Sequence, residues 1–144
     1  MTTTRRPRSR RSAKAAGSRF EREVADCLAE HVDDRIDRRV KTGAKDRGDI
    51  GGIRLHGQRL TVEVKNTSRL NLAGWMAEAE DERGNDDALA GVVIHKRHGV
   101  ADPLDQWVTC TVRELIAILR GSRIPEDPTP DHELADRFTR EDHR

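Results

Sequence analysis

Three charged side chains lie close enough in the sequence to meet on one β-hairpin. Asp49 precedes a short apolar stretch, and Glu63 and Lys65 alternate with Val62 and Val64 further along the chain. Alternate residues of a strand point to opposite faces, so Glu63 and Lys65 project side by side. Two carboxylates suit Mg²⁺, which prefers oxygen ligands and leaves other positions to water and phosphate oxygens. The ammonium group can orient or help deprotonate a bound water and offset charge that develops on a phosphate.

The construction of the hairpin decides whether Asp49 joins this pair. With a two-residue turn at Gly57–Gln58, an unbroken ladder sends Asp49 to the apolar face of the sheet. One extra residue at Gly51–Gly52 forms a bulge that reverses the face and brings Asp49 to Glu63 and Lys65. We therefore predict a bulge at the two glycines. The competing interpretation is a surface hairpin with an incidental Glu–Lys pair.

A helix is expected before the hairpin, from about Ala13 or Ser18 to His31. Its apolar stripe recurs every four residues at Phe20, Val24, Leu28 and Val32. Glu21 has two interpretations in this helix. Ser18 and Glu21 fit a capping box, in which the glutamate satisfies the helix start. If the helix starts earlier, Glu21 points into the site as a further carboxylate.

The remaining elements follow from apolar periodicity and turn residues. Before the hairpin we expect a strand at 35–42, with Ile36 and Val40 on one face, and a basic loop at 43–48. After it we expect a short strand at 70–72, a helix at 73–83, a doubly buried strand at 88–95 and a strand at 107–111. The last helix opens with a Thr111–Glu114 capping box, stops at Gly121 and packs on the sheet through Leu115, Ile116, Ile118 and Leu119. This order predicts an α/β sandwich around a central mixed sheet.

Composition and charge suggest one small domain between two polar segments. The chain has 144 residues, with 34% hydrophobic and 37% charged side chains. Residues 1–19 hold seven Arg or Lys and no acid, whereas residues 121–144 hold four basic and seven acidic side chains. We interpret residues 1–12 as a flexible basic arm for a polyanion, residues 13–121 as the domain, and residues 122–144 as an acidic, proline-containing tail.

Compartment is inferred from cysteine usage and from apolar runs. Cys27 and Cys110 match neither a disulfide framework nor a zinc motif, so reduced thiols are expected. The sequence has no apolar run of membrane-spanning length, and its arginine-rich start lacks the apolar segment of a secretion signal. We therefore expect a cytoplasmic protein without a membrane partner, in a bacterial cell or a phage-infected host.

The motifs taken together resemble a known superfamily. They are Gly17 and Glu21-Arg22-Glu23-Val24 on the first helix, then Arg39-Val40-Lys41-Thr42-Gly43, Asp49, and Glu63-Val64-Lys65-Asn66. This pattern resembles the PD-(D/E)XK nucleases, and its order and spacing are most similar to the archaeal-type Holliday-junction resolvases. Lys41 stands where those resolvases usually carry arginine, and Gly48 stands where the family name has proline.

The resemblance implies a restriction-endonuclease-like α/β/α sandwich and a metal-dependent active site. Asp49, Glu63 and Glu21 would bind Mg²⁺, with Mn²⁺ as a substitute, and Lys65 would be the catalytic lysine. DNA contacts are expected from basic residues on and around the site, namely Arg22, Arg39, Lys41, Lys45 and Arg69.

The implied activity is the resolution of four-way DNA junctions by paired phosphodiester hydrolysis. Two matched cuts call for two sites, so a homodimer is expected, with apolar groups on the helix of Trp75 as candidates for its interface. Two alternatives stay open. One is a nuclease of the same superfamily that acts on linear, flapped or foreign DNA. The other is a non-catalytic DNA-binding or assembly protein.

Overall fold

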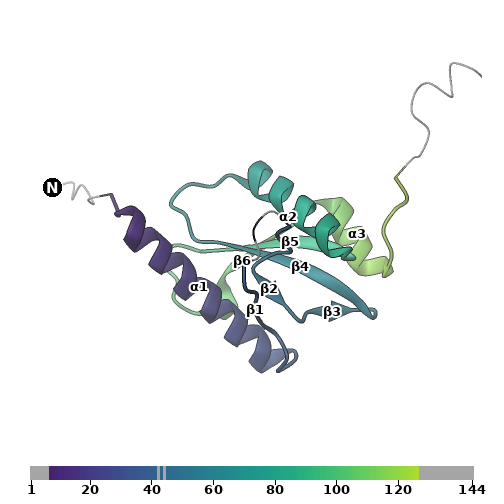
Figure 1. Ribbon diagram of the computed structural model, residues 1–144, viewed down its shortest axis with the longest axis horizontal. Helices are drawn as coiled ribbons and strands as arrows, with labels where there is room; N and C mark the ends of the chain where they lie inside the picture. The colour runs from purple at the N-terminus through teal and green to yellow at the C-terminus, as the bar shows by residue number, and fades with distance from the viewer. Residues whose placement is uncertain (1–6, 42, 44, 127–144) are drawn as a thin grey trace, which may run out of the picture.

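The computed structural model describes residues 7–41, 43 and 45–126 and shows a mixed α/β protein (Figure 1). Its elements are α1 (Arg10–His31), β1 (Asp37–Arg38), β2 (Ile50–Gly51), β3 (Arg54–Leu55), β4 (Gln58–Lys65), α2 (Leu72–Asp86), β5 (Ala90–His95), the 3-10 turn η1 (Pro103–Asp105), β6 (Trp107–Thr109) and α3 (Val112–Arg120). The predicted order of helices and strands is confirmed, except that the short strand expected at 70–72 is not formed. The expectations for residues 1–6 and for the tail after residue 126 lie outside the described residues.

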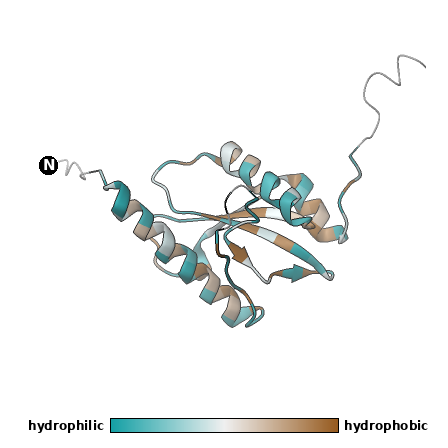
Figure 2. Cartoon of the chain, in the orientation of Figure 1, coloured by the Kyte–Doolittle hydropathy of each residue, from teal (hydrophilic) through white to brown (hydrophobic). Residues whose placement is uncertain are grey.

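The sheet is mixed, as predicted, and β4 and β5 form its centre. Its strands run in the order β1-β2-β4-β5-β6, with β3 also paired to β4. β4 and β5 are parallel, and the other pairs are antiparallel. All six residues of β5 are buried, which fits its largely apolar character. Figure 2 shows the hydrophobic residues concentrated in these central strands.

Helices cover both faces of the sheet. Phe20 and Val24 of α1 pack against Val62 and Ile94 on one face. Trp75 of α2 packs with Val93 and Ala79 on the other. Alternate residues of β4 therefore serve two different layers: Val62 and Val64 meet α1, while Thr61, Glu63 and Lys65 lie on the α2 side.

α1 begins earlier than expected. The side chain of Ser9 accepts a hydrogen bond from Ser12 N at 3.2 Å and caps the helix at Arg10. Ser18 is consequently an interior residue, and the capping-box interpretation of Glu21 is wrong.

Charged residues recur along all 22 residues of α1, and none of the described helices combines the length and apolar character needed to cross a bilayer.

The predicted bulge is present, but the turn is placed differently. Leu55 pairs with Gln58, so the two-residue turn is His56–Gly57, and both residues have positive φ, 52° and 73°. This is the pattern of a type I′ turn rather than a turn that starts at Gly57. Arg54 pairs with Arg59, whereas Ile50 pairs with Val62, so β2 and β3 together carry one residue more than β4 does.

Gly52 makes this bulge possible. Its φ is +84°, and a Cβ built there would lie 2.6 Å from the carbonyl oxygen of Arg35. We expect Gly52→Ala to lower the free energy of unfolding by about 2 kcal/mol, because it combines a left-handed backbone with a backbone clash. Urea unfolding measures this change. Gly17→Ala is the matched control: it lies inside α1 with open space around it and should stabilise by about 0.5 kcal/mol. Equal effects at the two positions would refute the role assigned to Gly52.

Two predicted strands differ from the structure. The first is reduced to Asp37–Arg38, and Val40 is 87% exposed, because β1 pairs with β2 over only two residues. The expected strand at 70–72 is absent. Asn71 instead caps α2 by accepting a hydrogen bond from Gly74 N at 3.2 Å.

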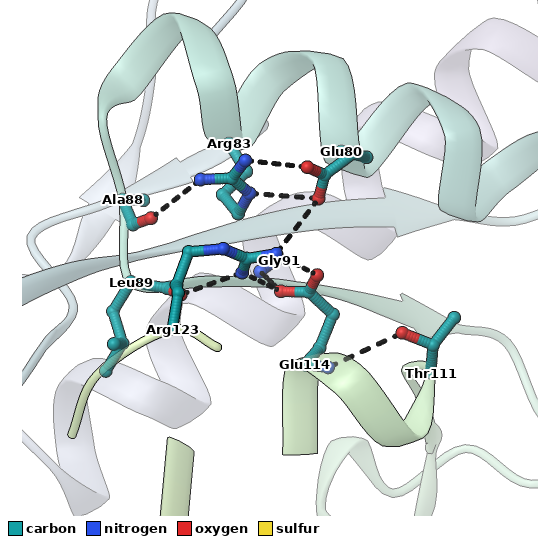
Figure 3. A network of polar contacts seen from close by, with 8 residues as sticks. All are labelled: Glu80, Arg83, Ala88, Leu89, Gly91, Thr111, Glu114 and Arg123. Carbon is teal, nitrogen blue, oxygen red and sulfur yellow. Dashed lines mark hydrogen bonds and ion pairs between the residues drawn. The ribbon is translucent and has the colours of Figure 1, made fainter. Parts of the chain in front are cut away.

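A polar network ties α3 to β5 and to the segment that follows α3 (Figure 3). Thr111 accepts a hydrogen bond from Glu114 N at 3.4 Å, so this half of the predicted capping box is confirmed. The buried carboxylate of Glu114 turns to the interior instead, where it accepts hydrogen bonds from Gly91 N at 3.0 Å and from Arg123 at 2.8 and 3.0 Å. Arg123, beyond the predicted end of the domain, is thus anchored in the protein interior.

Candidate active site

The bulge brings Asp49 to the same side of the sheet as Glu63 and Lys65, at the C-terminal end of β4. Asp49 N donates to Val62 O at 2.9 Å, and Asp49 Oδ2 accepts from Val64 N at 2.8 Å. Lys65 Nζ lies 3.2 Å from Glu63 Oε1. Asp49 and Glu63 are only 4% and 6% exposed. The structure therefore gathers two shielded carboxylates and one ammonium group at this position.

Glu21 approaches Asp49 from α1. Its Oε2 accepts a hydrogen bond from Arg38 Nη2 at 2.9 Å, and its side chain is 13% exposed. Its charge also contributes to raising the pKa of Asp49, which places the two carboxylates in electrostatic range. Lys41 Nζ lies 3.8 Å from Asp49 Oδ1. Arg38 is a partner that the sequence did not predict.

Burial and mutual repulsion disfavour the ionised carboxylates. Burial and then the charge of Glu63 raise the pKa of Asp49 to about 7. Burial and then the adjoining carboxyl group of Glu82 raise the pKa of Glu63 to about 8. Burial lowers the pKa of Lys65, but Glu78 and Glu63 outweigh it and the net shift is upward. Lys65 is therefore an ammonium ion at neutral pH, suited to stabilising negative charge.

These pKa shifts predict how stability depends on pH without divalent cations. The pKa values of Asp49 and Glu63 lie above their ordinary 3.8 and 4.5, so the folded state binds more protons. The stability that these two carboxyl groups contribute is complete below about pH 4. It is lost as pH rises through their folded-state pKa values near 7 and 8. Each pKa unit between the folded and unfolded values changes the free energy of unfolding by about 1.4 kcal/mol. We expect Tm in EDTA to fall by several degrees more between pH 5 and pH 8 in the wild type than in Asp49→Asn. Parallel calorimetric profiles for the two proteins would contradict this.

α2 supplies two carboxylates that sequence analysis missed. Glu78 pairs with Lys65, and Glu82 lies next to Glu63 with 7% of its surface exposed. Burial first, and then the charges of Asp46 and Asp49, raise the pKa of Glu82 to about 7. The signal in the sequence is the four-residue spacing of Glu78 and Glu82, which places both on one face of the helix.

The donor set fits a hard divalent cation in part. Across residues 7–41, 43 and 45–126, no three His, Cys, Asp or Glu side chains converge closely enough to hold a metal ion. Mg²⁺ commonly uses only one or two carboxylates together with water and substrate oxygens. Asp49 and Glu63 provide those two, and the buried Glu63 Oε2 has no hydrogen-bond partner in the part of the chain that the structure describes. Glu21 is paired with Arg38 and would join such a site only after leaving that partner.

A cleft beside the carboxylates is lined with cationic side chains. We call it the Arg39 cleft; its lining residues are Arg39, Val40, Lys45, Asp46, Arg47, Gly48, Arg59 and Asp86. The buried Asp86 holds two guanidinium groups in place, Arg39 at 3.0 Å and Arg59 at 3.4 Å. Four cations against two acids favour phosphate groups in this cleft. The predicted DNA contacts Arg39 and Lys45 are thus brought together, and Arg59 is an addition.

The other predicted DNA contacts lie in different surroundings. Arg22 is paired with Asp37 at 2.7 Å and with Asp26 at 3.2 Å, on a second cleft that also contains Glu21 and Lys41. The side chain of Lys41 is 70% exposed. Arg69 is exposed in the loop between β4 and α2 and lines neither cleft. Arg69 is therefore not brought to the candidate site by the contacts seen in the described residues.

Comparisons with known proteins add no assignment. Neither a family model, nor a characterised protein, nor a solved structure gives a significant match to this chain. Inferences about function therefore rest on the residues and their geometry.

Proposed function

We propose that this protein is a Mg²⁺-dependent endodeoxyribonuclease of the PD-(D/E)XK type, with a restriction-endonuclease-like fold, that resolves four-way DNA junctions. The observation that carries the proposal is the meeting of Asp49, Glu63 and Lys65 at the C-terminal end of β4, made possible by the bulge. Glu21 and the cations of the Arg39 cleft flank this position. Two carboxylates, an ammonium ion and nearby phosphate-binding groups are the components that metal-assisted phosphodiester hydrolysis needs.

Each side chain has a role that follows from its surroundings. Asp49 and Glu63 would hold the cation, which when bound polarises the phosphate and lowers the pKa of a water ligand. The Val64 amide fixes the orientation of Asp49. Lys65 places its positive charge where negative charge develops on the phosphate, and it orients the attacking water. Glu21 adds a further carboxylate when it is released from Arg38.

Cleavage of matched substrates tests the proposal. Purified protein is incubated with a four-way junction and with a linear duplex of the same sequence, in Mg²⁺ and in EDTA. We expect paired cuts in the junction that depend on Mg²⁺, together with much slower cleavage of the duplex. Preference for the linear duplex would leave a nuclease of the same type but remove the resolvase assignment. Binding without cleavage under all conditions would favour the non-catalytic alternative.

A homodimer is part of the proposal, and Trp75 itself cannot belong to its interface. Trp75 is 6% exposed and lies in the core against His95, so it is not available to a partner. Exposed apolar side chains are instead found on β6 and α3: Val108 63%, Val112 72%, Leu115 45% and Leu119 73%. The prediction that Leu115 and Leu119 pack on the sheet is wrong, because Glu114, Ala117 and Ile118 turn inward in their place. We propose that this face of α3 joins two copies.

Replacing both ends of this face tests the proposed interface. We expect the double variant Val112→Asp with Leu119→Asp to sediment as a monomer at concentrations where the wild type is a dimer, because charged groups inside an apolar interface are costly. Leu70→Asp is the control, since Leu70 is 71% exposed in a different segment. A double variant that still sediments as a dimer would exclude this face.

A further inference from the structure

Glu82 is the buried carboxylate that the proposed chemistry leaves unused. It lies one helical turn beyond Glu78 on α2, and this spacing matches Lys65 and Glu63 on β4: Glu78 contacts Lys65, and Glu82 adjoins Glu63. Both acids of α2 therefore meet β4.

The described part of the chain leaves Glu82 without a cation of its own. Glu82 is 7% exposed and Glu63 is 6% exposed, and the Oε2 atom of each has no hydrogen-bond partner among the described residues. When both groups are ionised, neither can donate a hydrogen bond to the other. Lys65, whose charge acts on Glu82, is already shared between Glu63 and Glu78. Asp46 and Asp49 add further negative charge around Glu82.

Buried carboxylates of this kind are costly in their ionised form unless a cation is present. Removing a charge from water without a partner costs several kcal/mol, and a second carboxylate alongside increases that cost. A divalent cation between the two groups would give both unpartnered oxygen atoms a ligand bond and would offset their repulsion. Carboxylate oxygens are the ligands that Mg²⁺ and Mn²⁺ prefer.

We propose that Glu82 is a carboxylate ligand of a divalent cation bound between Glu82 and Glu63, in addition to the cation position assigned to Asp49 and Glu63. This inference rests on the proposed function and deepens it, because paired metal ions are a common arrangement for in-line phosphodiester hydrolysis. Glu63 then serves both positions, with Asp49 as one neighbour and Glu82 as the other.

Calorimetric titration of the full chain with Mn²⁺, in the absence of DNA, tests the inference. We expect two ions per chain in the wild type. In Glu82→Gln we expect the second ion to be lost or to bind at least about tenfold more weakly, as is typical when a group that supports a metal site is removed. Asp81→Asn is the matched control: it removes the same charge from the next residue of α2, where the side chain is exposed. Its titration should match the wild type within twofold.

Thermal unfolding supplies a second readout that does not depend on cleavage. In EDTA, Glu82→Gln should be at least as stable as the wild type, because it removes a buried charge that has no partner. In Mn²⁺ it should gain less in Tm than the wild type gains. Identical Mn²⁺ binding by Glu82→Gln and the wild type would overturn the inference. If the wild type also cleaves junctions with Mg²⁺, the proposed function survives that result, whereas a wild type that neither binds Mn²⁺ nor cleaves DNA removes both.

Discussion

Lys65→Ala is expected to reduce junction cleavage by about 10³-fold while junction binding stays within about threefold of the wild type. Lys65 Nζ lies 3.2 Å from Glu63 Oε1, between the two carboxylates of β4 and α2. An ammonium ion fixed at that position stabilises charge that develops during hydrolysis, and losing one such group costs about 10²–10³ in rate. Single-turnover cleavage at saturating protein measures the rate, and gel-shift titration in Ca²⁺ measures binding.

Lys45→Ala provides the contrast for this experiment. Lys45 lines the Arg39 cleft and is exposed, so its loss should weaken junction binding and reduce the salt dependence by about one counterion. Cleavage at saturating protein should persist. If Lys65→Ala also cleaves at the wild-type rate, the carboxylates around it are structural, and the protein belongs to the non-catalytic class of DNA-binding or assembly proteins.

Arg123→Ala is expected to lower the free energy of unfolding by about 3 kcal/mol. Arg123 donates two hydrogen bonds to Glu114, whose side chain is 4% exposed, and a third to Leu89 O at 3.0 Å. Removing one partner of a buried ion pair leaves the other charge uncompensated, which costs about 3–5 kcal/mol. For a chain of this size, the loss corresponds to a decrease in Tm of roughly 6–12 °C. Urea unfolding and calorimetry measure the two quantities.

A double-mutant cycle separates this pair from general effects on the chain. Glu114→Gln combined with Arg123→Ala should cost less than the sum of the two single changes, because the remaining amide is neutral. Arg120→Ala is the control, since Arg120 is exposed at the end of α3. A loss below about 1 kcal/mol for Arg123→Ala would show that the network in Figure 3 contributes little to stability.

The sequence predicted those parts of the site that depend on neighbours in one hairpin. The alternation around Glu63 and Lys65 and the glycine pair before Ile53 were sufficient to predict which groups meet. The turn was misplaced by one residue because His56 adopts a positive φ, which the sequence pattern does not favour for a non-glycine residue. The predicted meeting survived because the bulge, rather than the turn, decides the side on which Asp49 lies.

Other parts of the site depend on how distant elements pack, and the sequence does not specify that packing. Glu82 meets Glu63 only because α2 lies against β4 in one particular register. Val40 has the alternation of a strand residue, but no neighbouring strand extends far enough to cover it. Leu119 fits an apolar helix face, yet the buried Glu114 and Ala117 determine which face turns inward. Each of these depends on tertiary contacts rather than local periodicity.

Because α1 begins at Arg10, the basic residues of its first turns have a fixed geometry. Arg10, Arg11 and Lys14 are exposed on the same continuous helix that carries Glu21 and is anchored in the core by Phe20. At 1.5 Å per residue, Lys14 lies roughly 10 Å along the helix axis from Glu21. The helix therefore fixes the distance between these cations and the carboxylates. A nucleic acid strand bound to the cations would be held at that distance without the entropy loss of ordering a loose segment.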